Sequence, residues 1–390
     1  MRMPTRGFFR RGFLAGLCAL WLNSVGEAAA FRQIADGLAT RHDVIPEGPL
    51  SLQVVRVDRT RTELQLLPTL GFGRQIGLNP LSSQLRLLPK ELGQPVAAIN
   101  GDFYTTENEP FPGDPRGLFI SGGELVSAPV KRDCFWLDPQ GQPHTGEVQS
   151  LFSLTWPDGG TTPLGLNESP DNLPAVLYSA AAGLPSVPND ALLLEYAGQG
   201  PWLPLHIGET YSARPVAWRR ALDTNTLAVV LPTELRGRVR QLKPDSILKI
   251  STGTTPNLRG TVTALGGGPA LVHGGRATAA RAVKSNERHP RSALGWNAQA
   301  YFLVVVDGRQ SDWSIGVTLP TLAEYMVGLG CEEAVNLDGG GSTELWLNGR
   351  VLNRPCQGRE RPTATGLAIV RRETPATNTP VLKSPVPAKP

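Results

Sequence analysis

Short apolar runs that end in glycine, proline or asparagine recur along this chain and restrict it to small secondary-structure elements. Examples are residues 191–196 (ALLLEY), 227–231 (LAVVL) and 247–250 (ILKI). The 390 residues include 43 glycines and 35 prolines, and only 6% are aromatic. This favours many short strands over long helices. Apolar spacing predicts two helices, at 79–92 and 320–330, each with a proline near its start. We therefore predict an α+β fold with β-rich mixed sheets and a few helices.

The first 30 residues are predicted to be an export signal rather than part of the fold. A basic start containing Arg10 and Arg11 precedes a short apolar run and a small-residue cleavage site before Phe31. The arginine pair resembles a twin-arginine signal, and a general secretory signal is the alternative. The apolar run is too short to be a membrane span. We expect a periplasmic or extracellular protein with one domain over residues 31–372 and a proline-rich disordered tail over 373–390.

The charge and the cysteines exclude several classes of protein. Residues 1–30 hold four arginines and one glutamate, a net +3 of the formal +4 of the whole chain, which leaves +1 after cleavage. This balance does not favour nucleic acid as a partner. Cys134, Cys331 and Cys356 remain, so at most one internal disulfide can form. No CxxC pair and no metal-type histidine spacing is present, and we expect no cofactor.

Four apolar runs end in a small-residue turn, three of which carry an acid. They read INGDF (99–103), GGGP (266–269), VVVDGRQ (304–310) and NLDGGGST (336–343). Three consecutive glycines exceed the needs of a hairpin, where one or two residues with positive φ suffice. Consecutive glycines also allow backbone N–H groups to face an anion. We therefore predict an active site on glycine-rich loops at strand ends.

Common glycine motifs do not explain residues 336–343. A nucleotide P-loop requires a lysine after its glycines, and none follows here. A nucleophile elbow requires a glycine where Glu344 stands, two residues after Ser342. The strand-like run at 345–347 replaces the helix of a dinucleotide site. What remains is an anion-binding turn beside Asp338, with an ordinary mobile turn as the alternative.

Acids and arginines stand at or near these turns. Asp102, Asp307 and Asp338 follow three of the apolar runs. Carboxylates at such positions serve as acid, base or nucleophile, or bind a hard cation such as calcium. Arginine forks bind phosphate oxygens bidentately. The arginines in similar contexts are Arg291, Arg309 and Arg361.

The ordered set INGDF, GGGPALV, HPRSALGW, VVVDGRQ, AVNLDGGGST and ERP resembles the motifs of the phosphodiester glycosidase family, which includes the N-acetylglucosaminidase known as the uncovering enzyme. The resemblance spans about residues 50–370. The chain departs from the family pattern at Asp102, where a glycine is usual, and at Ser292 and Thr343, which keep a polar hydroxyl.

The resemblance implies hydrolysis of a sugar-1-phosphodiester, with alpha-N-acetylglucosamine as the candidate sugar, at the anomeric C–O bond. A carboxylate would activate water or attack the anomeric carbon; Asp338 is the first candidate, Asp307 the second, and Asp102 is also included. The resemblance further suggests phosphate contacts, sugar contacts and an acid that orients an arginine. The residues concerned are Arg291, Arg309, Arg361, Gly339, Gly340, Gly341, Ser342 and Thr343 for phosphate, Asn100 and Asn336 for sugar, and Glu360 for orientation.

Two other classes of function remain open at this stage. A metal-dependent phosphodiesterase would break the P–O bond instead, but the sequence lacks a cluster of histidines and aspartates. A non-enzymatic glycan-binding protein of the envelope would expose aromatic platforms, and Trp313 and Trp346 lie near the motifs.

Overall fold

The computed structural model describes residues 29–46, 48–109, 111–170, 175–184, 190–216, 225–278 and 287–372. Residues 1–28 of the predicted signal and the predicted tail therefore lie outside the described residues. The described part contains four β-sheets and only short helices. The β-rich fold with few helices is thus confirmed. No helix in these ranges is long and apolar enough to cross a membrane.

An eight-stranded antiparallel sheet carries one side of the candidate site. Its central strand, β23, is buried along its whole length, as its sequence AYFLVVV predicts. Helix α4 (Leu319–Gly328) covers one face through Leu322 and Met326, and the Thr318 side chain caps its N-terminus. The helix predicted at 320–330 is therefore confirmed. The sheet order is β1 (Arg32–Ala35), β2 (Leu38–Ile45), β3 (Leu50–Asp58), β23 (Ala300–Val306), β22 (Arg291–Trp296), β24 (Glu333–Asn336), β20 (Ala270–His273) and β21 (Arg276–Ala277).

A five-stranded antiparallel sheet carries the other side of the site. The helix α2 (Leu81–Arg86) packs on it through Leu81 and Leu85. The helix predicted at 79–92 is shorter than expected because Pro89 interrupts it, and a 3-10 turn follows at Lys90–Leu92. The sheet order is β26 (Arg350–Val351), β25 (Leu345–Leu347), β5 (Gln94–Asn100), β27 (Thr365–Arg371) and β4 (Leu64–Leu70).

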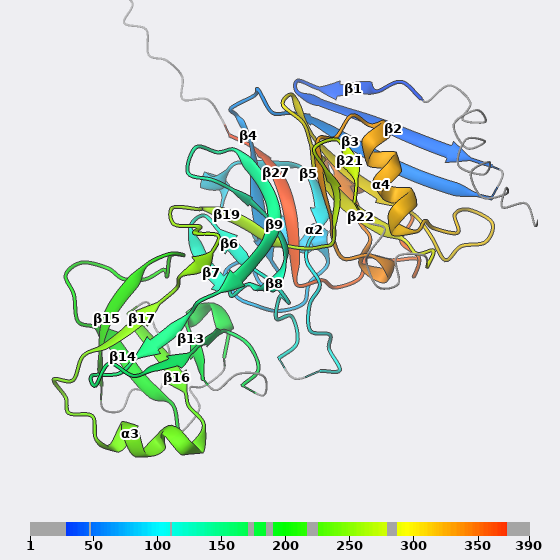
Figure 1. Cartoon of the computed structure of the whole chain (residues 1–390). Coiled ribbons are helices and arrows are strands. Elements are labelled where there is room, and N and C mark those ends of the chain that lie inside the picture. Colours follow the sequence, from blue (N-terminus) through cyan, green and yellow to red (C-terminus); the bar gives the residue numbers. More distant parts are fainter. Residues whose placement is uncertain are drawn as a thin grey trace, which may run out of the picture.

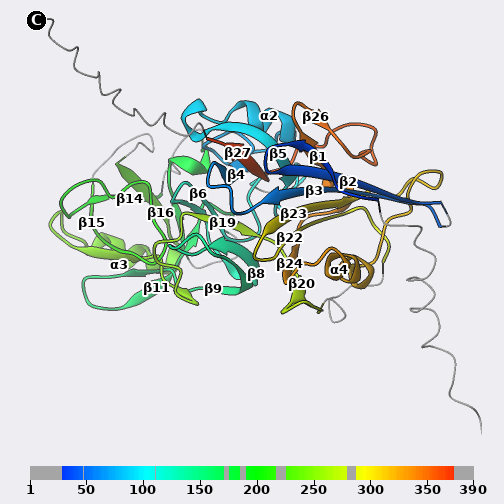
Figure 2. The same cartoon turned by 90° about the horizontal axis from the view of Figure 1, so that it is seen from above.

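A six-stranded sheet closes the arrangement around a shared core. Val55 of the first sheet, Ile99 of the second and Phe135 of the third belong to one buried cluster. The three sheets therefore surround this core in a barrel-like manner (Figures 1 and 2). The order of the third sheet is β18 (Thr254–Thr255), β9 (Pro143–Ser150), β8 (Val130–Leu137), β19 (Thr263–Gly266), β6 (Phe119–Ser121) and β7 (Glu124–Ser127).

A second eight-stranded sheet is inserted between β9 and β18. In Figures 1 and 2 it lies at one end of the molecule, opposite α4. It shares a core with the six-stranded sheet, since Leu154 and Ile250 cluster with Leu118 and Ala264. Its order is β11 (Thr161–Pro163), β10 (Ser153–Thr155), β17 (Leu248–Ser251), β15 (Thr210–Pro215), β14 (Leu192–Tyr196), β16 (Thr226–Val230), β13 (Val176–Tyr178) and β12 (Gly165–Leu166), with the helix α3 (Arg236–Arg240) nearby.

The prediction of mixed sheets holds only for this inserted sheet. Its β12 and β13 pair in parallel, whereas all other strand pairs in the described ranges are antiparallel. Several of the antiparallel pairs are hairpins of consecutive strands, such as β2 with β3, β8 with β9 and β22 with β23, and tight turns permit only antiparallel pairing.

Candidate active site

The glycine turn after Asp338 joins two different sheets rather than two strands of a hairpin. Strand β24 precedes it in the first sheet, and β25 follows it in the five-stranded sheet. The turn lies against the end of β5, because the Asp338 N–H donates to the Gly101 carbonyl at 3.0 Å. The loops around Asp102 and Asp338, predicted as separate motifs, therefore form one site.

Asn100 ties these loops together. Its Nδ2 donates to the Asp338 carbonyl at 2.7 Å, while its Oδ1 accepts from the Ser292 hydroxyl at 2.6 Å and from the Glu344 N–H at 3.1 Å. The side chain is almost fully buried. Both the nitrogen and the oxygen of the Asn100 amide are thus hydrogen-bonded within the protein, so this side chain holds the loops in position.

Asp307 is enclosed and fully hydrogen-bonded. Only 2% of the residue is exposed. Its carboxylate accepts from Trp313 Nε1 at 2.7 Å, from Asn353 Nδ2 at 3.1 Å and from the backbone N–H of Arg354 at 3.0 Å. A carboxylate saturated in this way fixes the surrounding loops.

Asp102 is enclosed in a different way. It is also 2% exposed, and its Oδ1 accepts from Arg132 Nη2 and from the Phe103 N–H, both at 2.7 Å. Its Oδ2 has no hydrogen-bond partner and packs against two glycines; a Cβ at Gly266 would lie 2.1 Å from it, and one at Gly117 2.6 Å. Burial raises the pKa of Asp102 to about 7 although Arg132 opposes this. The chain thus accommodates Asp102 through these glycines and Arg132.

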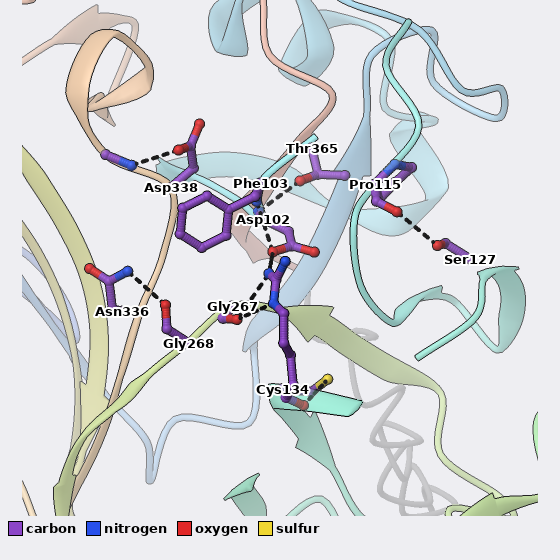
Figure 3. Close-up of polar contacts among 12 residues, drawn as sticks. Asp102, Phe103, Pro115, Ser127, Cys134, Gly267, Gly268, Asn336, Asp338 and Thr365 are labelled. Atoms are coloured by element: carbon purple, nitrogen blue, oxygen red, sulfur yellow. Dashed lines mark hydrogen bonds and ion pairs between the residues drawn. The ribbon is translucent and has the colours of Figure 1, made fainter. Parts of the chain in front are cut away.

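Asp338 is the predicted acid with a solvent-accessible face. The residue is only partly buried, and its Oδ1 accepts from the Gly339 N–H at 2.9 Å. Burial raises its pKa to about 6, while hydrogen bonds from Ser342 and Gly339 and the charges of Arg361 and Arg132 oppose the rise. Its charge in turn raises the pKa of Asp102. Figure 3 shows both carboxylates with the ring of Phe103 between them in this view.

The three glycines allow other groups to approach the turn closely. A Cβ at Gly339 would lie 2.7 Å from the Pro290 carbonyl, one at Gly340 3.0 Å from Arg309 Nη2, and one at Gly341 3.3 Å from Arg361 Cδ. Gly340 also has a φ of +60°. The Gly339 N–H is donated to Asp338, and the Gly340 N–H to the Pro290 carbonyl at 2.9 Å. These two N–H groups therefore already have partners, and the closest neighbours of the turn include two arginines.

These arginines supply positive charge without a carboxylate partner. No salt bridge of Arg309 or Arg361 occurs among the described residues, as judged by nitrogen-to-oxygen distances up to 4.0 Å. Arg309 is exposed and has a φ of +59°, which is uncommon for a residue other than glycine. Arg291 is held by the carbonyls of Val317 and Glu287, at 3.3 and 2.9 Å. Burial and the charge of Arg309 lower its pKa, so these two guanidinium groups are neighbours.

Sequence reasoning missed Arg132 and Tyr104. Arg132 lies on β8, 30 residues from the carboxylate that it binds, and also donates to the Gly267 carbonyl. The Tyr104 hydroxyl contacts the Ser342 hydroxyl at 3.3 Å, and Arg361 lies 5.7 Å from the centre of its ring. No local motif marks Arg132, whereas Tyr104 directly follows the INGDF motif at 99–103 and could have been included with it. Their proximity to the acids depends on the packing of separate sheets.

The other candidates lie around this centre in varied environments. Asn336 Nδ2 donates to the Gly268 carbonyl at 2.9 Å, whereas its Oδ1 is buried without a partner. Thr343 Oγ1 is also buried and unpartnered. Glu360 accepts from the Ser82 N–H at 3.1 Å, and its carboxyl group raises the pKa of Glu344 further after burial. Glu360 therefore contacts a second carboxyl group.

The burial of Glu344 beside Glu360 leads us to predict a pH-dependent effect of Glu344 on stability. Burial and Glu360 raise the pKa of Glu344 to about 9, above its ordinary value of 4.5. The neutral form of Glu344 stabilises the folded protein fully below pH 4.5. This stabilisation is lost as the pH rises towards 9, because Glu344 loses its proton at a lower pH in the unfolded chain than in the folded protein. We expect Glu344→Gln to raise the free energy of unfolding at pH 8 by at least about 1 kcal/mol, because one pKa unit corresponds to about 1.4 kcal/mol. Urea titrations at pH 5 and 8 test this; an equal effect at both values would contradict it.

No group of three or more histidine, cysteine, aspartate or glutamate residues suited to a metal ion occurs among the described residues. Cys134, Cys331 and Cys356 are free thiols, and the first two are buried.

Comparison with known proteins finds a family match for the C-terminal part of the chain. Residues 225–370, which include the Asp307 and Asp338 loops, match the family model described as phosphodiester glycosidase. This part of the chain is therefore similar to phosphodiester glycosidases. The resemblance inferred from the motifs is thus confirmed. An uncharacterised prophage-derived protein of Bacillus subtilis, YomE, is 35% identical over 85 residues, which are 22% of this chain and 13% of that protein.

Two solved structures share the fold of this chain. A hypothetical protein from Synechocystis matches with a TM-score of 0.66 and 21% identity, over 89% of this chain and 64% of that one. A protein of Burkholderia pseudomallei, proposed to be exported, matches with a TM-score of 0.60 and 20% identity, over 83% and 74% of the two chains. This chain thus spans less than two thirds of the Synechocystis protein and a small part of the prophage protein.

Proposed function

We propose that this protein is an exported hydrolase that cleaves a sugar-1-phosphodiester at the anomeric C–O bond. The observation that supports this most strongly is the environment of Asp338. Among the three acids on the motif loops, it combines an accessible face with two nearby arginines that have no carboxylate partner. The match of residues 225–370 to the phosphodiester glycosidase family supports the same reaction class.

In this proposal the ionised Asp338 supplies electrons to the anomeric carbon. It does so through a water molecule whose proton it takes as that water attacks, or by attacking the carbon itself to form a glycosyl-enzyme ester, which water then hydrolyses to release the sugar and the free carboxylate. The C–O bond to phosphate then breaks, and its electrons leave with the phosphate monoester. Because phosphate is a good leaving group, strong protonation by a second carboxyl is not required. This fits the enclosure of Asp102 and Asp307.

Arg309 and Arg361 receive the phosphate in this proposal. They lie over Gly340 and Gly341 and flank the turn that carries Asp338. Negative charge grows on the phosphate as the bond breaks, and fixed guanidinium groups stabilise it most where water is excluded. Arg291 adds positive charge next to Arg309.

Asp102 and Asp307 act as positioning residues in this scheme. Asp102 fixes Arg132, whose charge favours the ionised form of Asp338. Asp307 fixes Trp313 and the backbone at Arg354, beside the loop that carries Arg309. Asn100 serves the same purpose for the turn itself.

The pKa of Asp338 predicts the pH dependence of hydrolysis. Since the reaction requires the carboxylate and its pKa is about 6, kcat/KM should rise with pH up to about 6 and level off above it. One pH unit below this pKa, kcat/KM should be about tenfold lower than the plateau. A pH–rate profile with a single substrate measures this. A profile that falls through pH 6 would show that the protonated form is required instead.

A substrate screen tests the proposed activity. Sugar-1-phosphodiesters that differ in the sugar and in the aglycone, including alpha-N-acetylglucosamine 1-phosphodiesters, are incubated with the protein, and both products are identified. We expect a free sugar and an intact phosphate monoester. Loss of turnover after treatment with a metal chelator and recovery with divalent cations would instead support the metal-dependent phosphodiesterase.

A further inference from the structure

A pocket of about 510 Å³ lies beside the Asp102–Arg132 ion pair. Arg132 forms part of its wall and connects it to the site. Ser127 and Pro115, which are joined by a hydrogen bond of 3.1 Å, also line it (Figure 3). The proposed mechanism gives this pocket no role.

The ion pairs leave this pocket with excess negative charge. Its two arginines already have carboxylate partners: Arg132 binds Asp102, and Arg116 binds Glu109. Two more acids line the pocket, Asp114 and Glu168. Burial and then the charge of Glu168 raise the pKa of Asp114 to about 8, while Arg116 opposes the rise, so an ammonium group that binds here would favour its ionised form.

Asp114 is buried, and one of its carboxyl oxygens has no hydrogen-bond partner among the described residues. Only 9% of the residue is exposed, and its Oδ1 accepts no hydrogen bond. An unpaired buried carboxyl oxygen is costly and therefore uncommon in a folded protein. Glu168 Oε1 accepts a long hydrogen bond of 3.2 Å from the Leu166 N–H. The pocket thus presents acceptors for which a ligand can supply donors.

We propose that this pocket binds a primary ammonium group of the substrate, between Asp114 and Glu168. An ammonium group carries a positive charge and three donors, which match two carboxyl groups that form no salt bridge with the residues that the structure describes. No aromatic ring lines the pocket among the described residues, so the face-on contacts that recognise quaternary ammonium groups are missing. The substrate class is then a phosphodiester that carries a free amine, either on an amino sugar that is not acetylated or on the aglycone. This identification rests on the proposed function.

The inserted sheet provides one wall of this subsite. Glu168 follows β12 of that sheet, whereas Asp114 and Arg132 belong to the segment from β5 to β8. The subsite therefore depends on the inserted sheet being present.

Calorimetry with small probes tests the subsite without turnover. The probes are glucosamine and ethanolamine as amines, with N-acetylglucosamine, glucose and ethylene glycol as matched neutral compounds. We expect glucosamine to bind at least tenfold more tightly than N-acetylglucosamine and glucose if the amine belongs to the sugar. A corresponding preference for ethanolamine over ethylene glycol alone would place the amine on the aglycone.

Two variants separate the subsite from general effects. In Asp114→Asn and Glu168→Gln, the preference for the amine should fall at least tenfold while the affinity for the neutral probes is unchanged. Asp158→Asn, on the inserted sheet and paired with Arg238, is the matched control and should keep the preference. Melting temperatures establish that each variant is folded.

No preference for either amine in the wild-type protein, or a preference that survives in both pocket variants, would overturn the proposal. Hydrolysis of a phosphodiester without any amine preference would leave the proposed function intact and remove only this inference. Amine binding without any hydrolysis would support the amine subsite and contradict the proposed function.

Discussion

Replacing Asp338 with asparagine should reduce kcat/KM by about 100- to 10,000-fold, the range that a positioned base or nucleophile contributes. Asparagine has nearly the same shape and can still accept the Gly339 N–H bond, so the turn should keep its structure. Arg309 and Arg361 are unchanged, and binding of the phosphate monoester product should persist. Steady-state kinetics and product binding by calorimetry measure the two effects.

Asp312→Asn is the matched control for this variant. Asp312 is exposed near Asp307, and its side chain accepts a hydrogen bond from Ser311. We expect its kcat/KM to stay within about twofold of the wild type, since exposed side chains away from the site contribute little. Full activity of Asp338→Asn would mean that another carboxylate carries the reaction. The assignment of Asp338 would then be wrong.

Gly340→Ala should reduce kcat/KM by up to about 100-fold, with a much smaller effect on stability. The new methyl group would lie 3.0 Å from Arg309 Nη2, closer than an ordinary contact, so this guanidinium would have to shift, and misplacement of a binding group by about 1 Å sets an upper limit of about 100-fold on the loss. The left-handed φ of +60° adds strain of about 1 kcal/mol. Kinetics and thermal melts of the same preparation separate the two contributions.

Gly122→Ala reproduces the strain without the contact. Gly122 has a φ of +58° at the tip of the β6–β7 hairpin, and a Cβ there meets no atom within 4 Å. Its loss of stability should equal that of Gly340→Ala, but its activity should not change. Equal activities of the two variants would show that the glycine turn serves the fold alone.

Local sequence patterns predicted most elements but not how they assemble. The apolar runs at β14, β16 and β17 and the α4 helix are found where the sequence places them, because each depends on its own residues. Sheet membership depends on distant partners instead. The strands on either side of residues 337–344 belong to different sheets, and the sequence around them resembles a hairpin.

In the candidate site, too, the sequence predicted the residues but not the environments that packing creates around them. The sequence predicted three acids on separate loops, but their different exposures depend on residues far along the chain. Asp307 is saturated by Asn353 and Arg354, and Asp102 is held by Arg132 from another strand. Only packing distinguishes these enclosed carboxyls from Asp338. This also explains why Arg132 left no signal in the sequence.

The position of bond cleavage is the most direct test of the proposed reaction. The protein is allowed to hydrolyse a sugar-1-phosphodiester in heavy-oxygen water, and both products are analysed by mass spectrometry. Attack at the anomeric carbon places the heavy oxygen in the released sugar and leaves the phosphate monoester unlabelled, which is the result that we expect. Heavy oxygen in the phosphate monoester would show attack at phosphorus and would contradict the glycosidase mechanism.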